Sequence, residues 1–172
     1  WPGRVPAGAT CAEFASTIDI VPTFAKLIGA ELPDHKIDGR DIAPLLFGED
    51  GAKSPHDAFL HYYAGGQLQA IRDARWKLHF PHNYRTMDGR PGGQDGSPNP
   101  YSQASIGLEL FDLDNDPGET TDVASKHPAV VARLQALADA ARDDLGDKLT
   151  KAKGRGVRPA AKLTQSDERL AW

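Results

Sequence analysis

The sequence has a single cysteine, Cys11, so the chain can form no internal disulfide. A lone cysteine becomes a nucleophile when a nearby histidine or lysine lowers its pKa. The surrounding residues, "GATCAEFAST", include neither. We therefore expect Cys11 to be a small, semi-buried residue rather than a reactive thiol.

Long apolar runs and a strong net charge are also lacking. No run approaches the roughly 20 residues that a helix needs to span a bilayer, so we expect no membrane span. The net charge is only -4, which gives no overall field to favour nucleic acid or an anionic membrane as a partner. The opening "WPGRVPAG" has neither the basic start nor the apolar stretch of a signal peptide, and we expect it to be an excerpt of a longer chain.

The common catalytic motifs are missing as well. The sequence contains no HExxH, no paired CxxC, no GxSxG elbow and no GxxxxGK[ST] loop. His79 and His82 are three residues apart, but a strand followed by a proline is not a helix, so they need not face one centre. The residues alone therefore predict no complete catalytic constellation and no metal site.

What is present is the composition of a globular domain and a series of short elements. The 172 residues are 40% hydrophobic and 26% charged, which fits one domain or one domain plus a tail. Capping residues, Gly-Pro punctuation, alternation and helical spacing mark the elements. They are helices near 19–29 and 41–48, strands at 58–64, 68–73, 76–80 and 108–113, a long loop at 81–106, and a helix at 128–146 that begins with a proline.

This order predicts an α+β fold, in which a small antiparallel sheet of about four strands packs against the long C-terminal helix. The tail from Thr150 lacks periodicity, so we expect it to be extended or mobile. It could be a basic arm that binds an anion or a partner, or simply a solvated terminus. Its basic residues are Lys151, Lys153, Arg155, Arg158, Lys162 and Arg169.

The segment 108–119, "LELFDLDNDPGE", has the acidic density of a calcium loop. An EF-hand loop that started at Asp112 would need glycine at its sixth position and glutamate at its twelfth. Those positions are Pro117, which cannot adopt positive φ, and Val123, which has no side-chain oxygen. A strand followed by a β-turn explains the segment better, because Asp and Asn accept turn hydrogen bonds and Pro-Gly continues the turn.

Several segments together resemble the C-terminal region of the type I sulfatases, the arylsulfatase branch of the alkaline phosphatase superfamily. "STIDIVPTFAKLIGAELP" is similar to the family's "DLxPTxxxLAG" helix, and "IDGRDIAPLLFG" to its "DGxSLxPLL". "AIRDARWKLHF" resembles its "AxRxGxxKL" hairpin, and "LELFDLDNDPGETTDVA" its "ELYDLxxDPxExxNLA". The segments keep the family's order over about residues 1–149. Ala74 stands where the family usually has glycine, which would cost on the order of 1 kcal/mol if the turn needs positive φ.

The resemblance implies a sulfuric ester hydrolase whose chemistry lies in a missing N-terminal catalytic domain. In the family, a Cys or Ser in a C/S-x-P-x-R motif becomes formylglycine, and an aspartate-rich site holds calcium. Cys11 is followed by "AEF" and Ser97 by "PNP", so neither matches. We therefore expect no catalytic residue, metal ligand or cofactor in this chain, with calcium and formylglycine in the missing domain and this chain alone inactive.

The resemblance also implies a division of the chain. Residues 1–56 would be the linker and helices that join the catalytic domain, 57–149 the sheet-and-helix domain, and 150–172 the basic tail. The helix around Phe24 and Leu27 belongs against the catalytic domain, so we expect an exposed apolar patch there.

In relatives, the long loop of this region reaches the mouth of the active site. The matching residues His82, Tyr84 and Arg85 are therefore predicted to help shape the substrate pocket, with Arg85 pairing with a sulfate or uronate group. Alternatively, they only pack the loop onto the sheet. The expected partners are a sulfated small molecule or glycan and the catalytic domain of the same protein, in the periplasm or outside the cell. A competing hypothesis is a separately encoded, non-catalytic module that binds a sulfated glycan or a partner protein.

Overall fold

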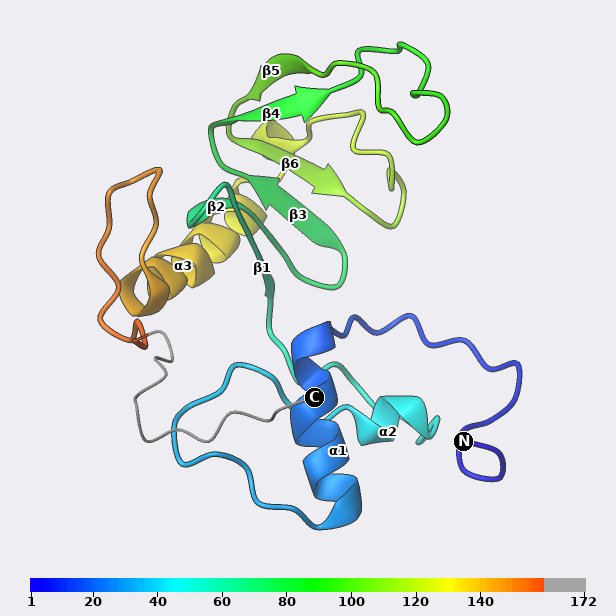
Figure 1. Ribbon diagram of the computed structural model, residues 1–172. Helices are drawn as coiled ribbons and strands as arrows, with labels where there is room; N and C mark the ends of the chain where they lie inside the picture. Colours follow the sequence, from blue (N-terminus) through cyan, green and yellow to red (C-terminus); the bar gives the residue numbers. More distant parts are fainter. Residues whose placement is uncertain (160–172) are drawn as a thin grey trace, which may run out of the picture.

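The computed structural model describes residues 1–159 and has the predicted α+β architecture (Figure 1). Four strands form an antiparallel sheet in the order β1-β2-β3-β6, and β4 and β5 form a second, two-stranded sheet. In chain order, the elements are η1 (Thr17–Asp19), α1 (Ile20–Ile28), α2 (Ala43–Leu46), β1 (Phe59–Tyr63), β2 (Gln67–Arg72), β3 (Trp76–His79), β4 (His82–Thr86), β5 (Ser102–Ile106), β6 (Glu109–Asp112), η2 (Ala124–Lys126) and α3 (Pro128–Leu145).

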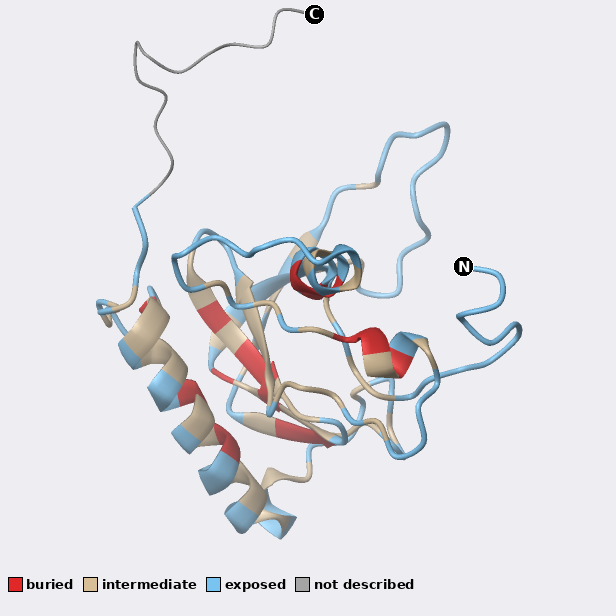
Figure 2. Cartoon of the chain, turned by 90° about the horizontal axis from the view of Figure 1, so that it is seen from below, coloured by how far each residue is buried: buried red, intermediate tan, exposed pale blue. Residues whose placement is uncertain are grey.

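The core lies between the four-stranded sheet and α3. Leu60 pairs with Ile71, Ile71 with Leu78, and Leu78 with Leu110, so these side chains form one row on one face of the sheet. α3 covers that face along its length, and its Leu134 is fully buried there (Figure 2). Burial of this apolar row is what holds the helix on the sheet.

The opposite face of the sheet carries both polar and apolar side chains, the latter including the buried Ala70 and Phe111. Because successive residues of a strand point to opposite faces, the neighbours of the buried row point away from α3. They include His61 of β1 and Lys77 and His79 of β3. We call this the outer face.

The prediction of a long loop over residues 81–106 is wrong in part, because both ends of this segment are strands. β4 and β5 pair in register from His82 with Ile106 to Thr86 with Ser102, and only the tip between them is irregular. In Figure 1, this hairpin lies at the opposite end of the sheet from α1. Its strands are polar and largely solvent-exposed, so they lack the apolar alternation that marks a half-buried strand.

The N-terminal third is organised around the buried carboxylate of Asp19. This carboxylate accepts hydrogen bonds from the backbone N–H of Ser16 and of Arg40, both at 2.8 Å, and lies 2.7 Å from Nε2 of His56. Burial acts to raise the pKa of Asp19, but these hydrogen bonds outweigh it and hold the pKa below its ordinary value. One side chain thus ties together three separate loops.

The apolar side of α1 faces away from the rest of the chain. Val21 is 61% exposed, Phe24 58% and Ile28 78%. The predicted apolar patch on this helix is therefore confirmed, although Leu27 itself is half-buried. The helix ends as predicted at Gly29, which has φ of 68°.

The described part of the basic tail, residues 150–159, contacts the fold. Arg155 forms an ion pair with Asp143 of α3, and Arg158 lies 2.6 Å from Asp38. Lys162 and Arg169 lie outside the described residues. Within residues 1–159, none of the helices has the length and apolar character needed to cross a membrane.

Candidate functional site

The acidic segment after β6 is a turn, as predicted. The carbonyl oxygen of Asp112 accepts hydrogen bonds from the backbone N–H of Asn115 and of Asp116. The carboxylate of Asp116 then accepts the backbone N–H of Thr120 and of Thr121, both at 2.8 Å. The segment therefore satisfies its own backbone and leads the chain toward α3.

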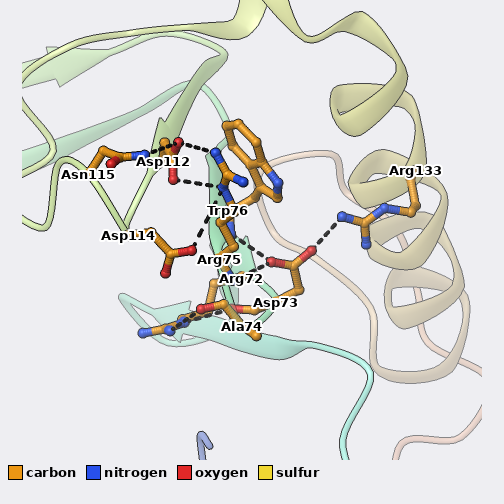
Figure 3. Close-up of polar contacts among 9 residues, drawn as sticks. All are labelled: Arg72, Asp73, Ala74, Arg75, Trp76, Asp112, Asp114, Asn115 and Arg133. Atoms are coloured by element: carbon orange, nitrogen blue, oxygen red, sulfur yellow. Dashed lines mark hydrogen bonds and ion pairs between the residues drawn. The ribbon is translucent and has the colours of Figure 1, made fainter. Parts of the chain in front are cut away.

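Arg75 neutralises this turn from the neighbouring hairpin (Figure 3). Its guanidinium makes two hydrogen bonds to the carboxylate of Asp112, at 2.9 and 2.6 Å, and lies 3.9 Å from Asp114. The Arg75 guanidinium and the amide of Asn115 lower the pKa of Asp112 to about 2. No group of three or more His, Cys, Asp or Glu among residues 1–159 is placed to hold a metal ion.

The turn between β2 and β3 is held by Asp73 (Figure 3). Its carboxylate accepts the backbone N–H of Arg75 at 2.8 Å and of Trp76 at 2.6 Å, and pairs with Arg133 of α3. Ala74, at the tip, does not adopt positive φ. The strain considered for alanine at this position therefore does not arise.

The three predicted pocket residues lie on β4, on both faces of the hairpin. His82 and Tyr84 share one face, with ring centroids 6.3 Å apart. Arg85 points to the other face, where its guanidinium carbon lies 6.0 Å from the ring centroid of Tyr101. Tyr84 and Arg85 are exposed and His82 is half-buried. The hairpin thus brings two of the three together and separates the third.

A polar cluster on the outer face was missed by the sequence reasoning. The carboxylate of Glu119 lies 2.6 Å from Nζ of Lys77 and 2.7 Å from Nε2 of His79. The ring of His79 stacks on that of His82, with centroids 5.7 Å apart. Their spacing alone did not require these two histidines to meet, and they do so because the chain crosses from β3 to β4 within two residues.

The charges of this cluster are set by burial and by the ion pair. Burial raises the pKa of Glu119, but its hydrogen bonds to Lys77 and His79 outweigh this and keep the pKa below its ordinary value. Burial lowers the pKa of His79, and Lys77 acts in the same direction. Burial and the charges of Lys77 and Arg72 lower the pKa of His61 to about 4. His61 is therefore neutral at pH 7, and the lowered pKa of His79, which the hydrogen bond to Glu119 partly offsets, favours its neutral form.

The cluster borders a pocket of about 370 Å³ that the rings of His61, His79 and His82 line together. Alternation in β1 and β3 was the available signal, since it places His61 and His79 on one face once the strands are in register.

Cys11 has no part in this site. It is exposed rather than semi-buried, because residues 1–12 run along the surface without an element to cover them.

The amino-acid sequence matches a known family over most of its length. Residues 54–165 match the family model described as the C-terminal region of aryl-sulfatase. The chain therefore belongs to the sulfatase family, to which it corresponds in the C-terminal region.

Curated relatives agree with this assignment. The mouse (Mus musculus) steryl-sulfatase is 38% identical over 160 residues, which cover 83% of this chain and 25% of the relative. Human (Homo sapiens) arylsulfatase A is 34% identical over 151 residues, which cover 80% of this chain and 28% of the relative. The chain thus spans about a quarter of the length of these relatives.

Solved structures show the same fold. The PsFucS1 sulfatase from Pseudoalteromonas sp. aligns with a TM-score of 0.64 at 21% identity, over 82% of this chain and 28% of that one. A sulfatase described with the metabolism of multiple glycosaminoglycans by Bacteroides thetaiotaomicron aligns with a TM-score of 0.52 at 26% identity, over 76% of this chain and 26% of that one.

Proposed function

We propose that this chain is the C-terminal part of a sulfatase that hydrolyses sulfate monoesters of aryl or carbohydrate compounds. The observation that carries the proposal is the family match over residues 54–165, in a chain that spans about a quarter of its relatives. In this proposal, residues 57–149 form the sheet-and-helix domain, 1–56 join it to the catalytic domain, and 150–172 form a basic tail.

The partner in this proposal is a catalytic domain of the same protein that docks on α1. The exposed side chains of Val21, Phe24 and Ile28 support it, because contiguous apolar surface of this kind marks an interaction site. That domain would supply calcium and formylglycine, for which the described residues offer no ligand set. A cation and basic groups are needed because negative charge builds on the leaving oxygen as a sulfate ester breaks. As is typical of the family, the complete protein would be located in the periplasm or outside the cell.

The chain's own contribution to the substrate pocket is the hairpin β4–β5. His82 and Tyr84 present two rings on one face, and Arg85 presents a guanidinium on the other. A planar guanidinium suits a sulfate or carboxylate group, because it can donate two parallel hydrogen bonds. The exposure of Tyr84 and Arg85 supports a role in contacting a ligand rather than in packing.

Two experiments test this proposal. The coding sequence upstream of Trp1 should encode a C/S-x-P-x-R motif in the same frame, and a start codon with no such domain would favour a separate binding module. In the complete enzyme, His82→Ala, Tyr84→Ala and Arg85→Ala should each lower kcat/KM about tenfold, as expected for a lost hydrogen bond or ion pair to the substrate. His35→Ala is the control, since His35 is exposed in a loop of the N-terminal third. Unchanged values for all three hairpin variants would refute a role of β4 in the pocket.

A further inference from the structure

The N-terminal third, residues 1–56, meets the sheet-and-helix part, residues 57–159, at a joint that few polar contacts cross. Within the part of the chain that the structure describes, every hydrogen bond and ion pair across this joint involves four charged side chains. They are Lys36, Asp38, Asp144 and Arg158. Nζ of Lys36 lies 2.6 Å from the carboxylate of Asp144. The guanidinium of Arg158 lies 2.6 Å from the carboxylate of Asp38 and donates to the carbonyl oxygen of Lys36 at 2.7 Å.

Apolar packing across the same joint is incomplete. A cavity of about 470 Å³ lies between the two parts, lined by Ile18 and His56 on one side and by Leu145 of α3 on the other. Side chains that line such a space do not touch across it, so burial of apolar surface holds this joint less firmly than it holds α3 on the sheet. The guanidinium of Arg72 adds one contact, 5.9 Å from the ring centroid of Phe14. The two ion pairs therefore have an unusually large share in joining the two parts.

The segment 146–158, which we call the strap, brings its last charged side chain to the joint from a fixed base (Figure 1). Asp147, near its start, is 2% exposed, and its carboxylate accepts the backbone N–H of Leu68 of β2 at 3.1 Å. Farther along, the backbone N–H of Arg155 donates to the carbonyl oxygen of Asp143 at 2.8 Å, and the two side chains form an ion pair. The strap is thus bound to the sheet and to α3 before it reaches the N-terminal third.

The strap approaches α3 closely because Gly154 has no side chain. A Cβ at this position would lie 2.3 Å from the backbone carbonyl carbon of Leu145, at the end of α3. Backbone atoms of a helix cannot move aside as the end of a side chain can, so alanine here would lift the strap from the helix. Gly154→Ala therefore displaces Arg158 from its partners without altering any charge.

We propose that the strap and the two ion pairs act as a latch that fixes the angle between the N-terminal third and the sheet-and-helix part. The proposal rests on the proposed function, in which the catalytic domain docks on α1 and the hairpin β4–β5 borders the substrate. Because α1 and the hairpin belong to different sides of the joint, the latch determines where the hairpin stands relative to the catalytic domain. The four charged side chains of the joint are therefore positioning residues.

Pulsed electron paramagnetic resonance measures this angle in the chain itself, without any need for activity. Cys11→Ser removes the native thiol, and spin labels are attached at two exposed positions through Ile28→Cys on α1 and Gln103→Cys on β5. The distribution of label distances should be narrow at low salt. It should become at least about twice as wide in Arg158→Gln, in Gly154→Ala and in 1 M NaCl, where the Debye length falls to about 3 Å.

Two further variants test whether the ion pairs themselves are responsible. Lys153→Gln is the matched control, because Lys153 is exposed on the same strap and forms no ion pair within residues 1–159, and its distribution should stay narrow. Arg158→Asp should widen the distribution, and adding Asp38→Arg should narrow it again, because the pair is restored with its charges exchanged. A distribution that stays narrow in Arg158→Gln, in Gly154→Ala and in 1 M NaCl overturns the latch, and so does equal widening in Lys153→Gln.

Kinetics of the complete enzyme test the positioning role. With phenyl sulfate, Arg158→Gln and Gly154→Ala should each lower kcat/KM about tenfold, because a small misplacement of groups that contact the substrate is costly. Lys153→Gln should stay within about twofold, and the exchanged pair should recover most of the loss. Wider label distances with an unchanged kcat/KM overturn the positioning role. Absence of turnover in the unaltered complete enzyme counts against the proposed function instead, and the label distances still decide the latch.

Discussion

Replacing Asp19 by alanine should destabilise the N-terminal third by about 3 kcal/mol. The change removes the carboxylate that accepts hydrogen bonds from the backbone N–H of Ser16 and of Arg40. It also leaves Nε2 of His56 without its partner. An N–H left unsatisfied costs about 1–3 kcal/mol when it is buried, and two partly buried ones, at the lower end of this range, are created at once. Alanine also removes the desolvation cost of burying the Asp19 charge. This offsets part of the lost stability and leaves a net loss of about 3 kcal/mol.

Urea denaturation followed by tryptophan fluorescence measures this loss. Trp1 contacts Phe47 beside α2 and therefore reports on the same third of the molecule. Asp19→Asn should lose less than Asp19→Ala, because the amide oxygen still accepts one of the two backbone N–H groups. Asp34→Ala, at an exposed carboxylate, should change the free energy of unfolding by less than about 0.5 kcal/mol. A loss below about 1 kcal/mol for Asp19→Ala would refute the view that this carboxylate joins the three loops.

Two further changes follow from the structure. The pKa of His61 falls from 6.5 to about 4 in the fold, so the unfolded chain binds the proton more tightly, and stability should fall by at most about 3 kcal/mol as pH drops from 6.5 to 4. His61→Gln should flatten this part of the stability profile measured by urea denaturation, and an unchanged slope would contradict the burial argument. Gly39→Ala would place its Cβ 1.9 Å from the carbonyl oxygen of Ile18, which should cost about 2 kcal/mol and lower Tm. Gly92→Ala, where a Cβ meets nothing within 4 Å, should leave Tm unchanged and serves as the control.

The elements predicted correctly are those with a strong local signal. Pro128 begins α3 and Gly29 ends α1, as their backbone preferences require. β1, β2, β3 and β6 combine β-branched or aromatic residues with an apolar row that α3 buries, so local propensity and burial agree. The sheet and its covering helix could therefore be predicted from the sequence.

The hairpin β4–β5 could not be predicted in the same way. "HNYRT" and "SQASI" are short and mostly polar, and their only apolar alternation is Ala104 and Ile106, which is too weak to separate them from the loop between them. Their pairing brings together residues about 20 positions apart, such as His82 and Ile106. Only the register of the hairpin shows that His82 and Tyr84 share a face while Arg85 does not.

The outer-face cluster was hidden for a different reason. Its members come from four segments, represented by His61 on β1, His79 on β3, His82 on β4 and Glu119 in the turn after β6. No motif spacing links positions so far apart in the sequence. The outward alternation in each strand was visible, but the strand order that makes them neighbours comes from the tertiary fold.

The acidic segment that resembled a calcium loop contributes to the site by another route. Arg75 neutralises Asp112, and backbone N–H groups satisfy Asp116, so a cation would have to displace partners already in place. The turn places Glu119 at φ of 54°, with its carboxylate over β3. That carboxylate fixes the proton of His79 on Nε2, and Nδ1 is left buried without a hydrogen-bond partner. The segment therefore sets the tautomer of one histidine, and Glu119→Gln, which can accept or donate, should weaken that tautomer preference.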